Sequence, residues 1–395
     1  MNETAAVHIP RIAKLAIGDQ VFDADAQELA EAIAQAYREQ QRPRCLCHPE
    51  GVEMYVAKVG ERYLIKRMPD SGAQHAPGCR AFETAEAVSG LEPLLGTAIL
   101  ADPGGGATTL RLDFSLSIQP GRRGPPPVSA VPRAGTLRHA GTRLSLRSML
   151  HYLWDEAGLT QWHPGFKGRR NWERVRQRLL HAAGHKIAGG ATLTSRLYVP
   201  EAFTLTQRDV ITDRRRAAWS CAVRRADRPQ QLLLLIGEIK EISPGRHGYK
   251  AVIRHIPEVA FSMDETLYRR VENRFADELA LWNASDEVRL VAIAPFGLND
   301  LGLPMMTGIY LMTATRHWLP VESVNERDLI DRLVDDERAF SKILRYDLRP
   351  DVQMASVALN DAGYPAPLLF AGAVDNSPRP LSASRPSAVS TAGQL

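Results

Sequence analysis

The sequence has few cysteines, no long apolar segment and no large excess of one charge. Only 4 of 395 residues are cysteine, which excludes the disulfide framework of a small secreted domain. No stretch approaches the roughly 18 consecutive apolar residues of a membrane span, and no apolar export segment follows the N-terminus. The net charge of +4 permits a polyanionic partner without requiring one. We therefore expect a cytoplasmic protein with no membrane contact.

The length and composition indicate a folded protein with more than one core. The 395 residues exceed the roughly 250 to 300 at which a single hydrophobic core stops growing. Hydrophobic residues make up 44% and charged residues 24%, as in an average globular protein. We predict an N-terminal module over 1–118, a linker rich in Pro, Gly and Arg over 119–142, a larger domain over 143–375, and a disordered tail over 376–395.

Local patterns predict a β-rich first module and a mixed second domain. Residues 54–59 and 62–67 flank a two-residue Gly-Glu turn, which is typical of a β-hairpin. The larger domain begins with a helical segment, and strand-sized apolar runs over 193–370 then alternate with helical patterns at 264–282 and 324–345. The predicted fold class is therefore α/β or α+β, with a sheet as the core of the larger domain.

Four side chains suited to metal binding are concentrated in the first module. Cys45 and Cys47 form one close pair, His75 and Cys79 form another, and the predicted hairpin separates the two pairs. Proteins commonly hold tetrahedral zinc in this way, and four protein ligands are typical of a structural site. We therefore expect zinc to stabilise this module. His48 is an alternative to His75 as a ligand, and three unrelated buried thiols with a surface histidine are the alternative to a metal site.

The densest basic segment lies near the start of the larger domain. It consists of Lys167, Arg169, Arg170, Arg174 and Arg178, with Trp162, His163 and Trp172 nearby. Arg174 and Arg178 lie on a predicted helix over 171–183, and Arg170 precedes them at the same spacing of four residues, so the three arginines form a basic stripe that can follow phosphates while aromatic rings stack on bases. A charged helix face is also the ordinary solvent-exposed surface. The segment is thus a candidate nucleic-acid-binding site.

A second group of residues is similar to a nuclease motif. Glu201 and Glu238 follow apolar strand-like runs, and Lys240 lies two residues beyond Glu238. In restriction-endonuclease-like nucleases, two carboxylates hold Mg²⁺ and a lysine orients the attacking water. Short motifs of this kind often arise by chance. A Mg²⁺-dependent nuclease is therefore an alternative function, and a protein-interaction scaffold is a third.

Four segments of the chain resemble a bacterial family, the domain of unknown function family eleven seventy-three. These segments are residues 44–79, 146–180, 232–242 and 317–340. The resemblance implies a setting near conjugative plasmid and integrative-element genes, and it implies no activity. Together with the cysteines and the basic segment, it indicates a zinc-binding accessory protein of a mobile genetic element, with nucleic acid and other mobile-element proteins as partners.

Overall fold

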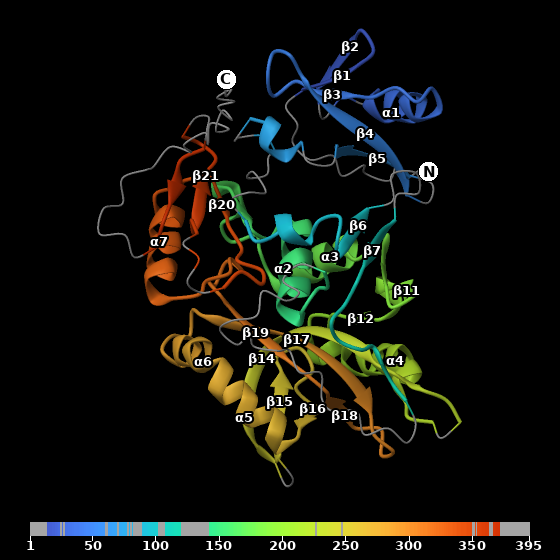
Figure 1. Cartoon of the computed structure of the whole chain (residues 1–395), viewed down its shortest axis with the longest axis vertical. Coiled ribbons are helices and arrows are strands. Elements are labelled where there is room, and N and C mark those ends of the chain that lie inside the picture. Colours follow the sequence, from blue (N-terminus) through green and yellow to red (C-terminus); the bar gives the residue numbers. More distant parts are fainter. Residues whose placement is uncertain are drawn as a thin grey trace, which may run out of the picture.

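A small N-terminal sheet forms the first part of the molecule (Figure 1). Its five strands lie in the order β2-β1-β3-β4-β5, namely Gln20–Asp23, Lys14–Ile17, Arg44–Cys45, Val52–Val59 and Arg62–Arg67. The antiparallel β4–β5 pair confirms the predicted hairpin. Helix α1 (Leu29–Arg38) buries Leu29, Ile33 and Ala36 in the same small core as Leu15 and Met54.

The computed structural model describes most of the chain. The described residues are 14–23, 26, 28–59, 62–68, 71–76, 79, 81, 89–101, 107–119, 142–225, 227–245, 248–349, 352, 354–362 and 366–371. Residues 120–141 of the predicted linker and the predicted tail over 376–395 lie outside this part. Within it, the fold is mixed α+β, which confirms the predicted class. No helix in these ranges combines the length and the apolar character needed to cross a bilayer.

The middle of the molecule joins segments from both sides of the predicted linker. Strands β6 (Ile99–Ala101) and β7 (Thr108–Leu110) share a sheet with β10 (Lys186–Ala188) and β11 (Ala191–Thr192), and β7 pairs with β10 in parallel. Leu94, Ile99 and Leu110 belong to the main hydrophobic core. The structure thus differs from the predicted division at residue 118, because β6 and β7 pack with the larger domain.

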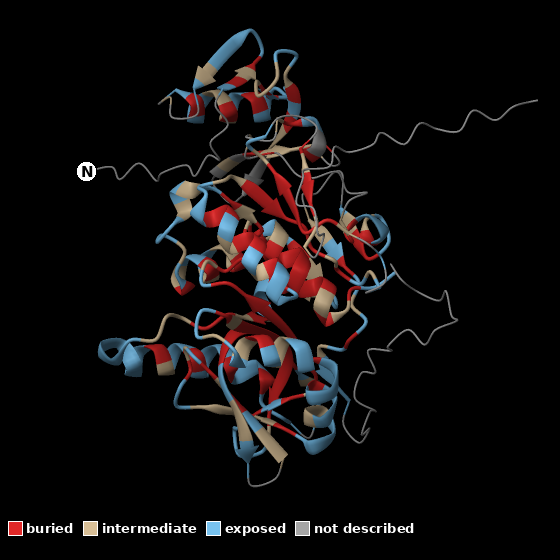
Figure 2. Cartoon of the chain, turned by 90° about the vertical axis from the view of Figure 1, so that its left-hand side faces the viewer, coloured by how far each residue is buried: buried red, intermediate tan, exposed pale blue. Residues whose placement is uncertain are grey.

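Two helices cover this middle layer, and the second begins at the start of the predicted helix over 171–183. Helix α2 (Leu146–Glu156) starts with a capping box, in which Ser145 and Ser148 each accept the other's backbone N–H. The side chain of Asn171 caps helix α3 (Trp172–Ala182). Burial is concentrated here and in the sheet beneath (Figure 2), and Trp154 is fully buried.

A second small sheet contains the C-terminal strands. Its order is β22-β21-β20-β9, namely Leu368–Leu369, Val357–Leu359, Phe340–Lys342 and Gln161–Trp162, and helix α7 (Val324–Asp335) packs on it through buried Ile330 and Val334. The predicted helix over 324–345 is too long. It ends because the chain reverses at Glu337, whose φ is +54°, and buried Phe340 then pairs with Trp162 as a strand.

The far end of the molecule is a closed ring of five strands. They are β14 (Leu233–Gly245), β15 (Gly248–Ile253), β16 (Ala260–Met263), β17 (Arg289–Leu298) and β18 (Pro304–Met306). The ring order is β14-β15-β16-β18-β17, and β14 also pairs with β17. All ring pairs are antiparallel except β16–β18. Helices lie between the third and fourth strands, and the connectivity is that of an OB-type Greek-key barrel.

The helices between β16 and β17, together with several short strands, complete the second domain. The predicted helix over 264–282 is divided at Phe275 into α5 (Glu265–Arg274) and α6 (Ala276–Asn283). Strands β12 (Leu197–Tyr198) and β19 (Tyr310–Ala314) extend the sheet beside β14 and β17. Strands β8 (Ser117–Ile118) and β13 (Gln230–Gln231) form a separate pair.

Ring closure requires β14 to pair with two different strands along its length. Its first half pairs with β17 and its second half with β15, and the register shifts between Ile239 and Glu241. Such a bulge bends a strand and increases its twist. A Cβ atom at Gly237 would lie 2.8 Å from Ile253 Cγ2, so glycine permits the close approach of the two strands.

Aromatic side chains fill the barrel. Phe261 and Phe296 point inward from β16 and β17, with ring centroids 5.2 Å apart. Trp219, at the end of helix α4 (Arg208–Trp219), packs on both rings at 5.6 Å and 5.1 Å. Aromatic burial of this extent stabilises a core strongly, so α4 closes one end of the barrel.

His255 makes the stability of this region depend on pH. Its ring stacks on Trp172 at 5.1 Å, and its Nδ1 accepts the Phe203 backbone N–H at 3.3 Å. Burial, with the nearby Arg254 and Arg289, lowers the pKa of His255 to about 4. The unfolded chain takes up this proton near pH 6.5, so the contribution is complete above that pH and is lost as the pH falls toward 4.

We expect His255→Asn to reduce this acid sensitivity, because the asparagine oxygen can accept the same backbone N–H without titrating. Urea unfolding of both proteins at about pH 7.5 and about pH 5 measures the difference. The variant should lose less stability than the parent between the two pH values. An equal loss in both proteins would show that other groups cause the acid sensitivity.

Candidate metal centre

Two turns bring the predicted metal ligands together. Cys45 ends β3, and the chain turns through Cys47 to Gly51, whose φ of +68° favours glycine. After the β4–β5 hairpin, a short 3-10 helix ends at His75, whose backbone N–H bonds to Gly72. The hairpin thus brings His75 and Cys79 back beside Cys45 and Cys47, as the spacing predicts.

Three distances between the donor atoms match those that one tetrahedral ion requires. Cys45 Sγ lies 3.6 Å from Cys79 Sγ, and His75 Nδ1 lies 3.4 Å from Cys47 Sγ and 3.8 Å from Cys79 Sγ. All four donors lie within 4.8 Å of one another. Zinc bonds of about 2.3 Å to sulfur and 2.0 Å to nitrogen, at tetrahedral angles, would place the donors about 3.5 to 3.8 Å apart.

The surroundings of this Cys/His cluster (Cys45, Cys47, His75 and Cys79) favour a thiolate at Cys79, while burial raises the pKa of the Cys47 thiol. The backbone N–H groups of Ala76 and Ala81 donate to the sulfurs of Cys47 and Cys79, each at 3.4 Å, and such bonds stabilise the charged form. A hydrogen bond with Cys45 is the main influence that lowers the pKa of the Cys79 thiol, and the same bond raises that of Cys45.

His75, and not His48, belongs to the cluster. The His75 ring is fully buried, and its Nδ1 faces the sulfurs. Four protein donors leave no open position for a substrate, so the arrangement can hold an ion but cannot present it for catalysis.

The Cys/His cluster also lies between two hydrophobic cores. Its cysteines contact the N-terminal core, and Cys79 in addition packs against the cluster that contains Ile343, Ala358 and Leu368 of the C-terminal sheet. An ion held here would therefore fix the N-terminal module and also the position of Cys79 against the second domain.

Two arginines of the predicted basic stripe form hydrogen bonds to backbone carbonyl groups of the protein itself. Arg170 donates to the carbonyl oxygens of Leu159 and Gln161, and its guanidinium lies over the rings of Trp162 and Phe166. Arg178 donates to the Ala157 carbonyl at 3.1 Å. These bonds satisfy carbonyl groups just after α2. The exposed members of the segment are Lys167, Arg169 and Arg174.

The candidate nuclease carboxylates each have arginine partners. Buried Glu238 accepts from Arg254 at 2.8 Å and from Arg289 at 3.0 Å. Glu201 forms a two-bond ion pair with Arg214, and Lys240 is exposed. Across the described ranges, the Cys/His cluster is the one group of three or more His, Cys, Asp and Glu side chains that can share an ion. The nuclease alternative stays a prediction.

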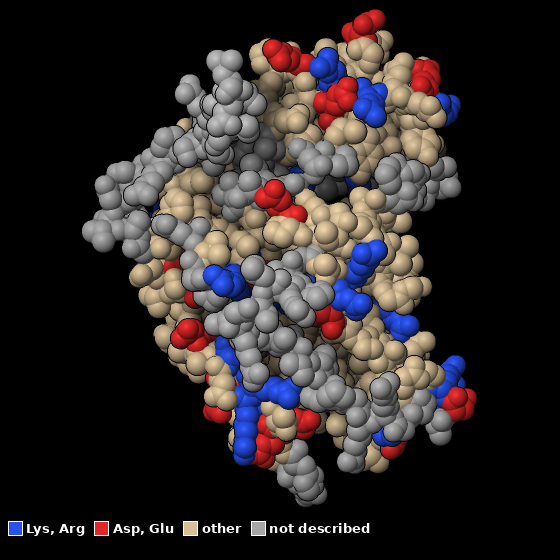
Figure 3. All heavy atoms as spheres, viewed as in Figure 1, with Lys and Arg blue, Asp and Glu red and all other residues tan. Residues whose placement is uncertain are grey.

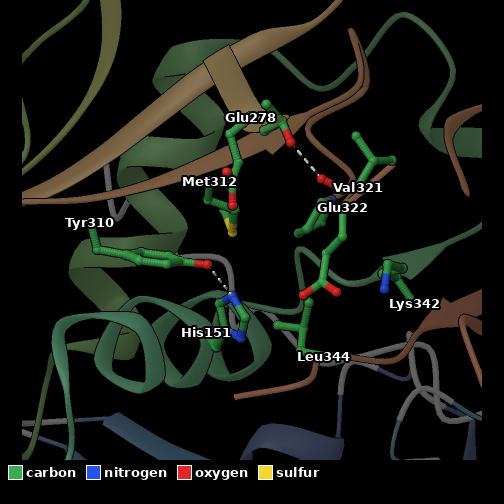
Figure 4. Close-up of a pocket in the computed structure, with 10 residues that line it drawn as sticks. His151, Glu278, Tyr310, Met312, Val321, Glu322, Lys342 and Leu344 are labelled. Carbon is green, nitrogen blue, oxygen red and sulfur yellow. Dashed lines mark hydrogen bonds between the residues drawn. The ribbon is translucent and has the colours of Figure 1, made fainter. Parts of the chain in front are cut away.

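A further group of titratable residues, which includes buried His151 and Tyr310, surrounds a small cavity (Figure 4). His151 Nε2 is hydrogen-bonded to the Tyr310 hydroxyl at 3.2 Å, and Glu322 accepts from Arg147 at 2.6 Å. Burial lowers the pKa of His151 and raises that of Glu278. The cavity is about 10 Å³, the lower limit for one water molecule. These residues are far apart in sequence, so no local pattern indicates them.

We expect the purified chain to contain one zinc ion, because the donor spacing suits a single tetrahedral site. Elemental analysis of native protein measures it. Cys45→Ser and His75→Ala should remove most of the metal, because three remaining ligands bind zinc far more weakly. His48→Ala and Cys221→Ser are the matched controls and should retain it. Loss of zinc in His48→Ala with retention in His75→Ala would contradict the ligand assignment.

We expect Glu238→Gln to reduce the free energy of unfolding by about 2 to 3 kcal/mol, because Arg289, whose side chain is 31% exposed, loses the charged acceptor of its hydrogen bond. Urea unfolding measures the change. Glu241→Gln, on the exposed part of the same strand, is the control and should stay within about 0.5 kcal/mol of the parent. Equal stability of Glu238→Gln and the parent would contradict a structural role for this carboxylate.

Comparison with known proteins identifies a family but no characterised relative. No curated protein and no solved structure matches the chain. The model of one family, described as Protein of unknown function (DUF1173), matches residues 15–389. The match includes the Cys/His cluster, the middle layer and the barrel. The chain therefore belongs to the DUF1173 family.

Proposed function

We propose that the Cys/His cluster holds a structural zinc ion. The spacing of 3.4 to 3.8 Å between bonded donors carries the proposal. Three sulfurs and one imidazole are a donor set suited to zinc, and carboxylate or carbonyl oxygens, which magnesium and calcium prefer, are absent from the set. The ion would stabilise a module whose own core is small.

We also propose that the protein is an accessory nucleic-acid-binding protein. The support is the OB-type connectivity of the barrel, an architecture that commonly binds oligonucleotides. Fold alone does not determine function, so the proposal needs a site on this chain. On the face seen in Figure 3, acidic and basic side chains are interspersed, so charge does not identify a binding site there. A mobile-element setting is supported by the family resemblance alone.

Salt dependence tests nucleic-acid contact directly. We expect the full chain to bind a fluorescein-labelled oligonucleotide in an anisotropy titration. For about three phosphate contacts on a single strand, affinity should fall about 20-fold between 50 and 200 mM salt, because binding releases counterions. A protein-interaction scaffold would instead show no binding to single-stranded DNA, duplex DNA or RNA at any of these salt concentrations.

A further inference from the structure

The outer face of the barrel carries a row of three side chains from neighbouring strands, those of Lys250, Ser262 and Met305. Register places Lys250 of β15 opposite Ser262 of β16, and Ser262 opposite Met305 of β18. Their sequence neighbours Ala251 and Phe261 are buried inside, so the row faces outward. Adjacent strands lie about 4.8 Å apart, and the row therefore spans about 10 Å.

Aliphatic side chains project at one end of this row. Leu301 is 82% exposed, Leu303 50% and Met305 43%. Asn299 holds the loop that carries the leucines, because its Oδ1 accepts the backbone N–H groups of Leu301 and Leu303 at 3.0 and 2.9 Å. Two exposed leucines on this hydrogen-bonded loop and exposed Met305 of β18 form an apolar patch, and such patches mark interaction sites.

Exposed arginines lie beside the same loop. Val223 bridges to Leu298 at the end of β17, and Gln230 Nε2 donates to the carbonyl oxygens of Ala222 and Leu298. The intervening segment carries Arg224, Arg225 and Arg228, all exposed. Its acidic neighbours are Asp227 and Asp300, and Arg224 lies 4.0 Å from Asp300. The segment and the loop thus carry three arginines and two aspartates, a formal charge of +1.

We propose that this face of β15, β16 and β18, with the loop at 299–303 and the exposed residues Arg224, Arg225 and Arg228, binds single-stranded DNA. The proposal rests on the nucleic-acid-binding function proposed above and assigns its site and ligand. Arginines would contact phosphates, while the aliphatic side chains pack on unstacked bases and on thymine methyl groups. A duplex keeps its bases stacked inside, which makes a single strand the better match. The thymine methyl group favours DNA over RNA.

Anisotropy titration of the full chain with labelled oligo(dT) tests the site. We expect Met305→Glu, and separately Arg225→Glu with Arg228→Glu, to weaken binding at least about tenfold, because each places negative charge against the DNA backbone. Val324→Glu is the apolar control, since Val324 is 50% exposed on α7, and Arg332→Glu, at an exposed position of the same helix, is the basic control. Both controls should bind as the parent does. Thermal unfolding curves confirm that each variant is folded.

Each other outcome has a separate meaning. Absence of binding by the parent to any nucleic acid overturns the proposed function, and this inference with it. Binding that Arg174→Glu with Arg169→Glu abolishes, and that the barrel variants leave unchanged, overturns the barrel site and keeps the function. Tighter binding to oligo(U) or to duplex DNA than to oligo(dT) overturns the assignment to single-stranded DNA.

Discussion

The pairing of β14 with β17 is the interaction on which the second domain depends. It joins Leu233–Ile239 to residues 290–296, and nearly every side chain along both segments is buried. Without it the ring of strands would be an open sheet, and Phe261, Phe296 and Trp219 would have no closed interior to fill. The pair also places Glu238 next to Arg289, so burial of the Glu238 carboxylate beside an arginine follows from ring closure.

Local patterns in the sequence were sufficient for the metal cluster and for most helix starts. Cys45, Cys47, His75 and Cys79 were predictable because ligand pairs and a hairpin turn are visible within a short segment. Ser145 and Asn171 were predictable for the same reason, since a helix cap depends on residues close in sequence. The predictions of the hairpin and of the cluster support each other, because the hairpin turn also brings the two ligand pairs together.

The barrel and the arginine contacts could not be predicted in this way. Ring closure depends on pairs more than fifty residues apart, such as Ile239 with Leu290, and no periodicity within one segment reports them. Arg170 and Arg178 fit an exposed helical stripe, but their positions beside the end of α2 direct them to backbone carbonyls. The sequence also predicts helix after residue 335, but buried Phe340 forms a strand that pairs with Trp162.

Closure of the ring has a further consequence for association between copies of the chain. A strand inside the ring has hydrogen-bonding partners on both sides, so it offers no template for another chain. The outer members of this sheet are β12 and β19, which are two and five residues long. Short edge strands are poor sites for intermolecular strand addition. The architecture thus protects its most apolar sequence, 232–236, from templated aggregation.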